Sequence, residues 1–154
     1  MNYKLTPMTI EHIPQIAALE RACFSRPWSE ESLQGELWND SAVVIVAEGE
    51  DGTVLGYAGL QTVLDEGYIN NVAVDEKFRR QGVADELIAA FVRFGQAKLA
   101  FLTLEVRKSN AAAIGLYEKY GFQQVGIRKG FYSHPREDAV IMTREFPQNA
   151  SENT

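Results

Sequence analysis

The order of hydrophobic and polar residues along the first half of the chain predicts two short helices and an antiparallel meander. The Asp51-Gly52 pair separates two stretches rich in β-branched residues, which is typical of a hairpin turn. Thr9 is a candidate N-cap for the first helix, although Pro14 is awkward inside a helix that begins there. The predicted strands are 4–7, 42–48, 54–63 and 68–74, and the predicted helices are 10–23 and 29–37.

The second half changes to alternating strands and helices. Val83, Leu87 and Phe91 recur at helical spacing and predict an amphipathic helix over 83–95. Asn110 is expected to cap a further helix that ends at Tyr120, before Gly121. The predicted strands are 101–106, 122–127 and 139–146.

These elements predict a single α/β domain over residues 1–146, followed by a flexible tail over 147–154. A meander followed by strand–helix units predicts a mixed, mostly antiparallel central sheet of about six or seven strands, with helices on both faces.

Composition narrows the class of protein. The 154 residues are 45% hydrophobic and 23% charged, which is ordinary for a globular domain, and no apolar run has the length of a membrane span. Glu11 and His12 interrupt any early signal peptide, and the single Cys23 favours a reducing compartment, so we expect a cytoplasmic protein without a membrane partner. His12, expected at the surface, and His134 are too few and too far apart to predict a metal site.

Charge is distributed unevenly along the chain. The net charge of −6 argues against a nucleic-acid binder. Residues 1–75 carry 12 acidic and 3 basic side chains, whereas residues 76–154 carry 9 acidic and 12 basic ones. The first half could attract a cationic partner and the second an anion, unless these are ordinary solvated surface charges.

A strand, a basic turn, a glycine and a helix follow one another in residues 71–84. The unpaired N–H groups at a helix N-terminus favour an anion, and Gly82 would let a phosphate approach the main chain. Arg79 and Arg80 would add charge-assisted hydrogen bonds. The segment therefore predicts a pyrophosphate site, with a plain turn and a solvated basic loop as the alternative. It contains neither a P-loop nor a Gly-x-Gly-x-x-Gly fingerprint, which argues against a nucleotide-binding module.

The pattern Arg79-x-x-Gly82-x-Ala84 resembles the Arg/Gln-x-x-Gly-x-Gly/Ala signature of GNAT acetyltransferases, whose loop holds the pyrophosphate of acetyl-CoA. Residues 104–122 are similar to the second half of that cofactor site: a strand, a capped helix and a Tyr-x-x-x-Gly-Phe ending. The resemblance covers nearly the whole chain and is greatest to the bacterial ribosomal-protein-alanine N-acetyltransferases. The segments that carry this finer resemblance are 24–29, 104–107 with 109–110, and 136–139 with 141–142.

The resemblance implies a GNAT fold, acetyl-CoA as co-substrate, no metal, and roles for particular residues. Glu105 is implied to be the general base and Tyr117 the general acid, and Tyr117 and Asn110 to contact the cofactor. The main chain of Val72, Ala73 and Val74 is implied to pair with the acetyl and pantetheine arm, and Arg80, Gln81, Gly82, Val83, Ala84 and Asp85 to surround the pyrophosphate. Relatives often carry a basic or small residue at the place of Asp85, so we expect its side chain to point away.

The implied acceptor is the N-terminal alanine of a small-subunit ribosomal protein of the bS18 type, with a basic N-terminal peptide as partner. An α-amine of pKa about 8 costs only about 1 kcal/mol to deprotonate at pH 7, whereas a lysine costs nearly 5 kcal/mol. A carboxylate such as Glu105 can meet the smaller demand, and a phenol such as Tyr117 can protonate the departing thiolate. Without the resemblance, Glu105 would be interpreted as a salt-bridged strand residue and Tyr117 as a core aromatic.

Two aromatic residues are candidate peptide contacts. Trp28 either lines the peptide entrance or staples the junction of the first two helices, and Tyr132 is expected in a loop over 129–135. Two rival functions stay open: a GNAT enzyme that acetylates lysine or a small-molecule amine, and a non-catalytic sensor that binds acyl-CoA. The sequence does not indicate an oligomeric state.

Overall fold

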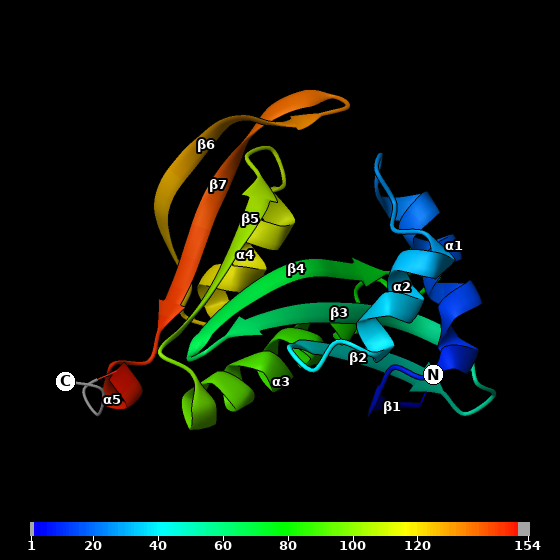
Figure 1. Cartoon of the computed structure of the whole chain (residues 1–154). Helices are drawn as coiled ribbons and strands as arrows, with labels where there is room; N and C mark the ends of the chain where they lie inside the picture. Colours follow the sequence, from blue (N-terminus) through cyan, green and yellow to red (C-terminus); the bar gives the residue numbers. More distant parts are fainter. Residues whose placement is uncertain (1, 151–154) are drawn as a thin grey trace. The chain divides into compact units, whose positions relative to one another are not determined.

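The computed structural model describes residues 2–150 (Figure 1). The first half contains β1 (Tyr3–Pro7), η1 (Ile10–His12), α1 (Ile13–Cys23), α2 (Glu30–Leu37), β2 (Ala42–Gly49), β3 (Val54–Val63) and β4 (Glu66–Val74). The second half contains η2 (Glu76–Phe78), α3 (Val83–Lys98), β5 (Phe101–Arg107), α4 (Ala111–Lys119), β6 (Gln123–Ser133), β7 (Arg136–Glu145) and α5 (Pro147–Ala150).

The strands form a seven-stranded sheet in the order β1-β2-β3-β4-β5-β7-β6. The pairings β1–β2, β2–β3, β5–β7 and β6–β7 are antiparallel, whereas β4 pairs with β5 in parallel through residues 66–68 and 101–103. A parallel pair needs a long crossover, and α3 lies in the segment that connects β4 with β5. The mixed, mostly antiparallel α/β fold predicted from the sequence is therefore confirmed.

The chain divides into two compact units. Unit 1 contains residues 2–61 and 71–87, and unit 2 contains residues 62–70 and 88–150. Each is described by itself, and a single domain over 1–146 stays a prediction.

In unit 1, helices α1 and α2 pack on one face of the sheet. Their apolar side chains form a cluster with Val46 and Tyr57 of β2 and β3. Ala47 and Ala58 directly neighbour Val46 and Tyr57 along their strands, so they point to the other face, and both are fully buried as well. Both faces of the sheet are thus buried, and its strands carry long hydrophobic runs.

The start of α1 differs from the sequence prediction. The turn η1 precedes the helix, so Pro14 occupies the first turn of α1, where its missing N–H costs nothing. His12, expected at the surface, is only 5% exposed. Its Nδ1 accepts a hydrogen bond from Thr9 N at 2.9 Å, and its Nε2 contacts Glu48. The hydrogen bond with His12 lowers the pKa of the Glu48 carboxyl.

In unit 2, β6 and β7 form a longer hairpin than predicted. β6 continues through Ser133, so Tyr132 lies on a strand rather than in the expected loop over 129–135. Backbone register explains the extension, because Tyr132 pairs with Glu137 and Ser133 with Arg136. Strand pairing therefore overrides the local glycine and proline content of this segment.

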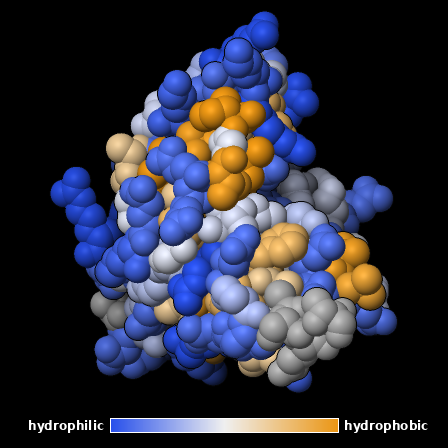
Figure 2. Space-filling view, turned by 90° about the vertical axis from the view of Figure 1, so that its left-hand side faces the viewer, coloured by the Kyte–Doolittle hydropathy of each residue, from blue (hydrophilic) through white to orange (hydrophobic). Residues whose placement is uncertain are grey.

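The edge strand of unit 2 carries exposed hydrophobic residues. Val125 and Ile127 of β6 are 61% and 48% exposed. Figure 2 shows the side of the molecule that lies on the left in Figure 1. Hydrophobic side chains gather in its upper half, at the height of the β6–β7 hairpin in Figure 1. β6 ends the strand order, so its outer edge has no neighbour in this sheet.

The described segment after β7 contains a short helix. Residues 147–150, predicted as the start of a flexible tail, form the short helix α5. The Asn149 side-chain amide donates to the carbonyls of Gly95, Gln96 and Leu99 at 2.8–3.1 Å, which satisfies carbonyls at the end of α3. Residues 151–154 of the predicted tail lie outside the described residues.

Across residues 2–150, no helix combines the length and the hydropathy that crossing a membrane requires.

Candidate functional site

The last residues of β4 are held closely against β3 in unit 1. A Cβ placed on Gly56 would lie 2.7 Å from the Ala73 carbonyl oxygen, so only glycine allows this approach. Asp75 N donates to Leu55 O at 2.8 Å just beyond the strand. The segment Val72–Val74, implied to hold the acetyl and pantetheine arm, is thus fixed on its β3 side.

Arg79 has a structural contact that the sequence did not predict. Its Nε donates to Val74 O at 3.2 Å, so the guanidinium folds back onto the end of β4. The preceding turn is stabilised by Asp75, whose carboxylate accepts from Lys77 N at 3.0 Å. Arg79 therefore shapes the turn, although its side chain is exposed like that of Arg80, which is among the residues predicted to surround the pyrophosphate.

The turn between η2 and α3 contains two left-handed residues. Arg80 has φ 66° and Gly82 has φ 81°, with Gln81 between them. A Cβ on Gly82 would meet nothing within 4 Å, so here the backbone angle rather than space favours glycine. Successive N–H groups in such a turn form a concave surface suited to an anion.

The N-terminus of α3 supplies main-chain donors. Its first helical hydrogen bond runs from Glu86 N to Gly82 O at 3.1 Å. The N–H groups of Val83 and Ala84 precede that bond and have no acceptor inside the helix. The helix dipole adds partial positive charge at the same place. These features favour binding of a phosphate group.

Asp85 interacts with β1 of the same unit. Burial raises the pKa of Tyr3 to about 12, with further contributions from a hydrogen bond to Glu86 and from the charges of Glu86 and Asp85. The Asp85 carboxylate is therefore close enough to Tyr3 to influence its ionisation. Its expected orientation away from a bound phosphate stays a prediction.

In unit 2, Glu105 and Arg107 share one face of β5, because the alternate residues Leu104 and Val106 are buried on the other. The Glu105 carboxylate is one-third exposed and lies 3.4 Å from the Arg128 guanidinium of β6. This is the salt-bridged geometry that the sequence left as the alternative to a general base. An exposed pair of this kind contributes little to stability and can open.

Tyr132 lies beside the same face of β5. The Arg107 guanidinium stacks 4.3 Å from the centre of the Tyr132 ring. Burial raises the pKa of Tyr132, Arg107 lowers it, and the charges of Glu105 and Glu137 raise it. The structure thus brings Glu105 and Tyr132 into one electrostatic neighbourhood.

Tyr117 is nearly buried, at 7% exposure, with its ring 5.8 Å from that of Phe122. Burial raises its pKa to about 12, and Tyr132 contributes to the shift. Asn110 caps the same helix: its Oδ1 accepts from Ala113 N at 3.1 Å, which leaves the side-chain NH₂ as a donor for another group. Glu105, Tyr117, Tyr132 and the Asn110 cap therefore all belong to unit 2.

Trp28 has a structural role in unit 1. Its side chain packs against the core of that unit. The main-chain N–H of Trp28 donates to the Glu20 carboxylate at 2.8 Å. This supports the interpretation of Trp28 as a staple of the helix junction and leaves a peptide contact as a prediction.

Sequence reasoning missed several residues that organise these segments. Glu137 accepts from Ser109 N at 2.6 Å and from Arg107 at 3.2 Å, and so ties β7 to the turn before α4. Glu20 is fully buried. Its position on the apolar stripe of α1, after Ile13 and Ile16, could have revealed it, whereas no local pattern distinguishes Glu137.

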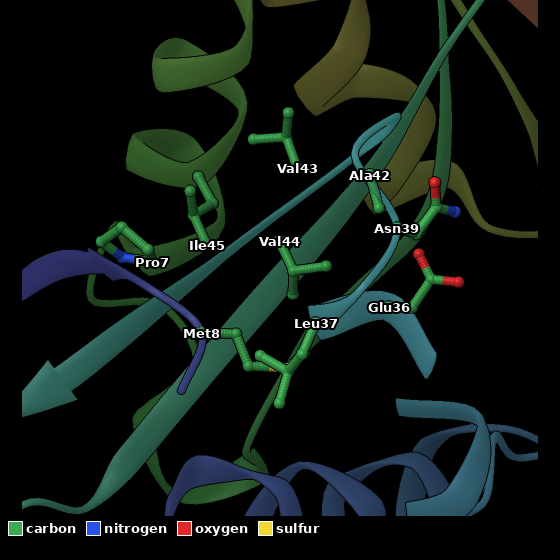
Figure 3. Close-up of a pocket in the computed structure, with 9 residues that line it drawn as sticks. All are labelled: Pro7, Met8, Glu36, Leu37, Asn39, Ala42, Val43, Val44 and Ile45. Atoms are coloured by element: carbon green, nitrogen blue, oxygen red, sulfur yellow. The ribbon is translucent and has the colours of Figure 1, made fainter. Parts of the chain in front are cut away.

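A hollow of about 250 Å³ lies in unit 1 between β1, the start of β2 and the end of α2. In Figure 3, Met8, Leu37 and Val44 lie near its centre, with Glu36 and Asn39 to one side. Burial raises the pKa of Glu36. None of the catalytic or binding residues predicted from the sequence lines this hollow.

Among the described side chains, no group of three or more His, Cys, Asp and Glu residues could hold a metal ion.

Comparisons with known proteins identify the family of the chain. Residues 13–122 match the family model "Acetyltransferase (GNAT) family". The chain is 40% identical over 129 residues to the [ribosomal protein bS18]-alanine N-acetyltransferase of Haemophilus ducreyi, covering 80% of this chain and 87% of that protein. It is 37% identical over 136 residues to the enzyme of the same name from Escherichia coli K12, covering 84% and 88%.

Solved structures show the same fold. The crystal structure of the ribosomal-protein-S18-alanine N-acetyltransferase from Escherichia coli has a TM-score of 0.85 at 32% identity and covers 94% of each chain. Arabidopsis thaliana NAA60 in complex with acetyl-CoA also has a TM-score of 0.85, at 20% identity, covering 94% of this chain and 98% of that one, and supports the fold alone. By the family model and by these relatives, the chain belongs to the acetyltransferase (GNAT) family.

Proposed function

We propose that this protein transfers the acetyl group of acetyl-CoA to the α-amine of an N-terminal alanine on a small-subunit ribosomal protein of the bS18 type. The observation that carries the proposal is its 37–40% identity, over most of both chains, to enzymes named for that reaction. The segments that resemble this group in the sequence lie on α1–α2, β5–α4 and β7.

The residues proposed to contact the co-substrate are main-chain groups of unit 1 and the Asn110 cap of α4 in unit 2, and each set lies within its own unit. The pyrophosphate is assigned to Arg80, Gln81 and the first turn of α3, where donors and positive charge coincide. The acetyl and pantetheine arm is assigned to Val72–Val74 and to the Asn110 amide. Support comes from the left-handed turn at Gly82 and from the donor that the Asn110 cap leaves unused.

Glu105 is proposed as the general base. An α-amine requires about 1 kcal/mol to lose its proton at pH 7, which a carboxylate can supply directly or through one water. The Glu105 carboxylate lies 3.4 Å from the Arg128 guanidinium, and an exposed pair of this kind can open when an amine binds. The tetrahedral intermediate would be stabilised by main-chain N–H groups at the end of β4.

Tyr117 is proposed as the proton donor to the departing thiolate. Its pKa of about 12 keeps the phenol protonated throughout the neutral range. A free thiol has a pKa of about 8.5, so full transfer to the thiolate would be uphill by roughly 5 kcal/mol without further stabilisation. The structure therefore supports a role in which the phenol stabilises the thiolate first through a hydrogen bond, with transfer completed as CoA leaves.

The acidic first half of the chain supports a basic substrate. A peptide that carries Arg or Lys after its N-terminal alanine would be attracted by a segment with 12 acidic and 3 basic residues. The single cysteine favours action in the cytoplasm, where bacterial ribosomal proteins are made.

The test is a panel of peptides with mass mapping of the modified nitrogen. A peptide with a free N-terminal alanine and following basic residues should be acetylated, whereas the same peptide with a blocked N-terminus and intact lysines should not. Equal rates on the blocked and free peptides would instead identify a lysine acetyltransferase. Binding of acetyl-CoA without CoA release on any peptide or amine would identify a sensor.

A further inference from the structure

Glu20 is a buried carboxylate for which the proposed chemistry has no use. It lies on α1, is 0% exposed, and accepts three hydrogen bonds. Its Oε1 accepts from Trp28 N at 2.8 Å, and its Oε2 accepts from the Tyr57 hydroxyl at 2.5 Å and from the Asn71 amide at 2.9 Å. All four residues belong to unit 1.

Burying a carboxyl group costs free energy unless its oxygens accept hydrogen bonds. This carboxyl group accepts hydrogen bonds from Tyr57 of β3, from Asn71 of β4 and from Trp28 in the α1–α2 loop. Tyr57 is held in its neutral, donating form, because burial and Glu20 both raise its pKa. A buried carboxylate with complete partners fixes geometry more than it adds net stability.

The loop between α1 and α2 depends on this carboxylate. Phe24 N still bonds back to Glu20 O at 2.9 Å, and Ser29 caps α2 by accepting from Ser32 N. Between Phe24 and Ser29, the main chain of the described structure is held by the hydrogen bond from Trp28 N to Glu20. Tyr57 and Asn71 hold one oxygen of Glu20 in place, and the other oxygen holds the loop.

We infer that Glu20 is a positioning residue for the peptide acceptor. It fixes the α1–α2 loop, which carries the candidate peptide contact Trp28, to the sheet of unit 1. The kinetic consequence of this inference rests on the proposed function. Its structural consequence, the restraint of the Trp28 main-chain N–H, does not. The hydrogen bonds that Glu20 accepts do not reach the pyrophosphate turn at Arg80–Gly82. Because Asn71 directly precedes the segment assigned to the acetyl arm, the Kd for acetyl-CoA is the measurement that separates an effect on the acceptor from one on the co-substrate.

The proposed function makes a kinetic test possible with Glu20→Ala and the conservative variant Glu20→Gln. Glu20→Ala leaves Trp28 N without its acceptor, so the KM for the basic alanine peptide should rise at least tenfold, while the Kd for acetyl-CoA should change less than threefold. Glu20→Gln should restore most of the loss. Its carbonyl oxygen can hold Trp28 N, and its NH₂ can face the Tyr57 oxygen and a turned Asn71 amide, both of which can accept.

Tyr57→Phe is the matched control, because it removes a donor from the same carboxylate but leaves the bond to Trp28. It should lower the unfolding temperature with little change in peptide KM. If Glu20 only stabilised the fold, peptide KM would follow unfolding temperature across the three variants, and that result would overturn the inference.

Amide hydrogen exchange gives a readout that does not depend on catalysis. Exchange of the Trp28 N–H should be at least tenfold faster in Glu20→Ala than in the parent, and nearly restored in Glu20→Gln. If Glu20→Ala fails to fold, Glu20→Asp replaces it, because the shorter side chain cannot reach Trp28 and the Tyr57–Asn71 pair together. Unchanged Trp28 exchange in a folded variant overturns the inference, and faster exchange in a protein that acetylates no peptide would contradict the proposed function alone.

Discussion

The two parts of the proposed site are built from different kinds of chemical group. In unit 1 the segment proposed to bind phosphate consists of main-chain N–H groups, two left-handed residues and the exposed Arg80. In unit 2 the proposed chemistry depends on side chains: Glu105 is paired with Arg128, and Tyr132 contributes to the raised pKa of Tyr117. A main-chain site tolerates most side-chain changes and fails when the backbone angle changes. A side-chain site fails when one functional group is replaced.

Replacement of the proposed base should have the largest effect on turnover. Glu105→Gln keeps the size of the side chain but cannot accept a proton, so kcat should fall by roughly 10²–10⁴-fold. The Kd for acetyl-CoA should stay within about threefold of the parent, because the pyrophosphate segment is main-chain and lies in unit 1. Steady-state CoA release and isothermal titration measure the two quantities.

Glu118→Gln is the matched control for Glu105, since Glu118 is an exposed carboxylate of the same unit. It should leave kcat unchanged. Near-parental turnover in folded Glu105→Gln would show that positioning alone accounts for the rate.

Loss of the proposed proton donor should rank second. Tyr117→Phe removes one hydroxyl from a nearly buried ring and should lower kcat by about 10²-fold with little change in acetyl-CoA affinity. Tyr68→Phe, at an exposed tyrosine of unit 2, provides the comparison. If a substrate with a more acidic leaving thiol does not rescue Tyr117→Phe, the role of Tyr117 lies in packing.

The main-chain part of the site can be tested at Gly82. Gly82→Val places a branched side chain at φ 81°, which costs roughly 1–2 kcal/mol and should weaken acetyl-CoA binding about 10-fold as the turn relaxes. Gly52→Val is a close control, because Gly52 has φ 85° and also meets nothing within 4 Å. Both variants should lose similar stability in urea unfolding, but only Gly82→Val should lose affinity.

These elements also show what the sequence could reveal. The strand, turn and helix of residues 71–84, which we propose to bind an anion, were predictable because such a turn leaves a residue pattern, a strand followed by basic residues, glycine and a helix. The strand bounds of β3 and the cap at Asn110 were predictable for the same local reason.

Long-range contacts were not predictable. Burial of His12 depends on Glu48, 36 residues away, and the extension of β6 to Ser133 depends on pairing with β7. The assignments of Glu105 and Tyr117 came from the resemblance to a family, because no physical pattern separates a catalytic carboxylate from a salt-bridged one. Arg79 illustrates the limit within a recognised motif, since its bond to Val74 O could not be inferred from composition.

The two arginines of the turn should differ in effect. Arg80→Ala should weaken acetyl-CoA binding by about 1–2 kcal/mol, and the loss should shrink as salt rises, because an exposed charge is screened. Arg79→Ala removes the bond to Val74 O and should lower stability and affinity together, with little dependence on salt. Isothermal titration at low and high salt, combined with thermal unfolding, separates the two. Equal salt dependence would contradict the distinct roles.

The burial of Tyr117 predicts a pH dependence that sharpens the contrast between the two parts. A phenol whose pKa rises from its ordinary 10.0 to about 12 on folding stabilises the protein fully below pH 10, and this contribution is lost as pH rises through 12. Relative to pH 9, the parent should lose about 1 kcal/mol at pH 11 that Tyr117→Phe does not lose. Urea unfolding of both proteins at the two pH values gives the difference, in which the other tyrosines cancel. Parallel losses in the two proteins would show that Tyr117 ionises as freely in the folded state as in the unfolded one, and its proposed role as a donor held protonated by burial would then fail.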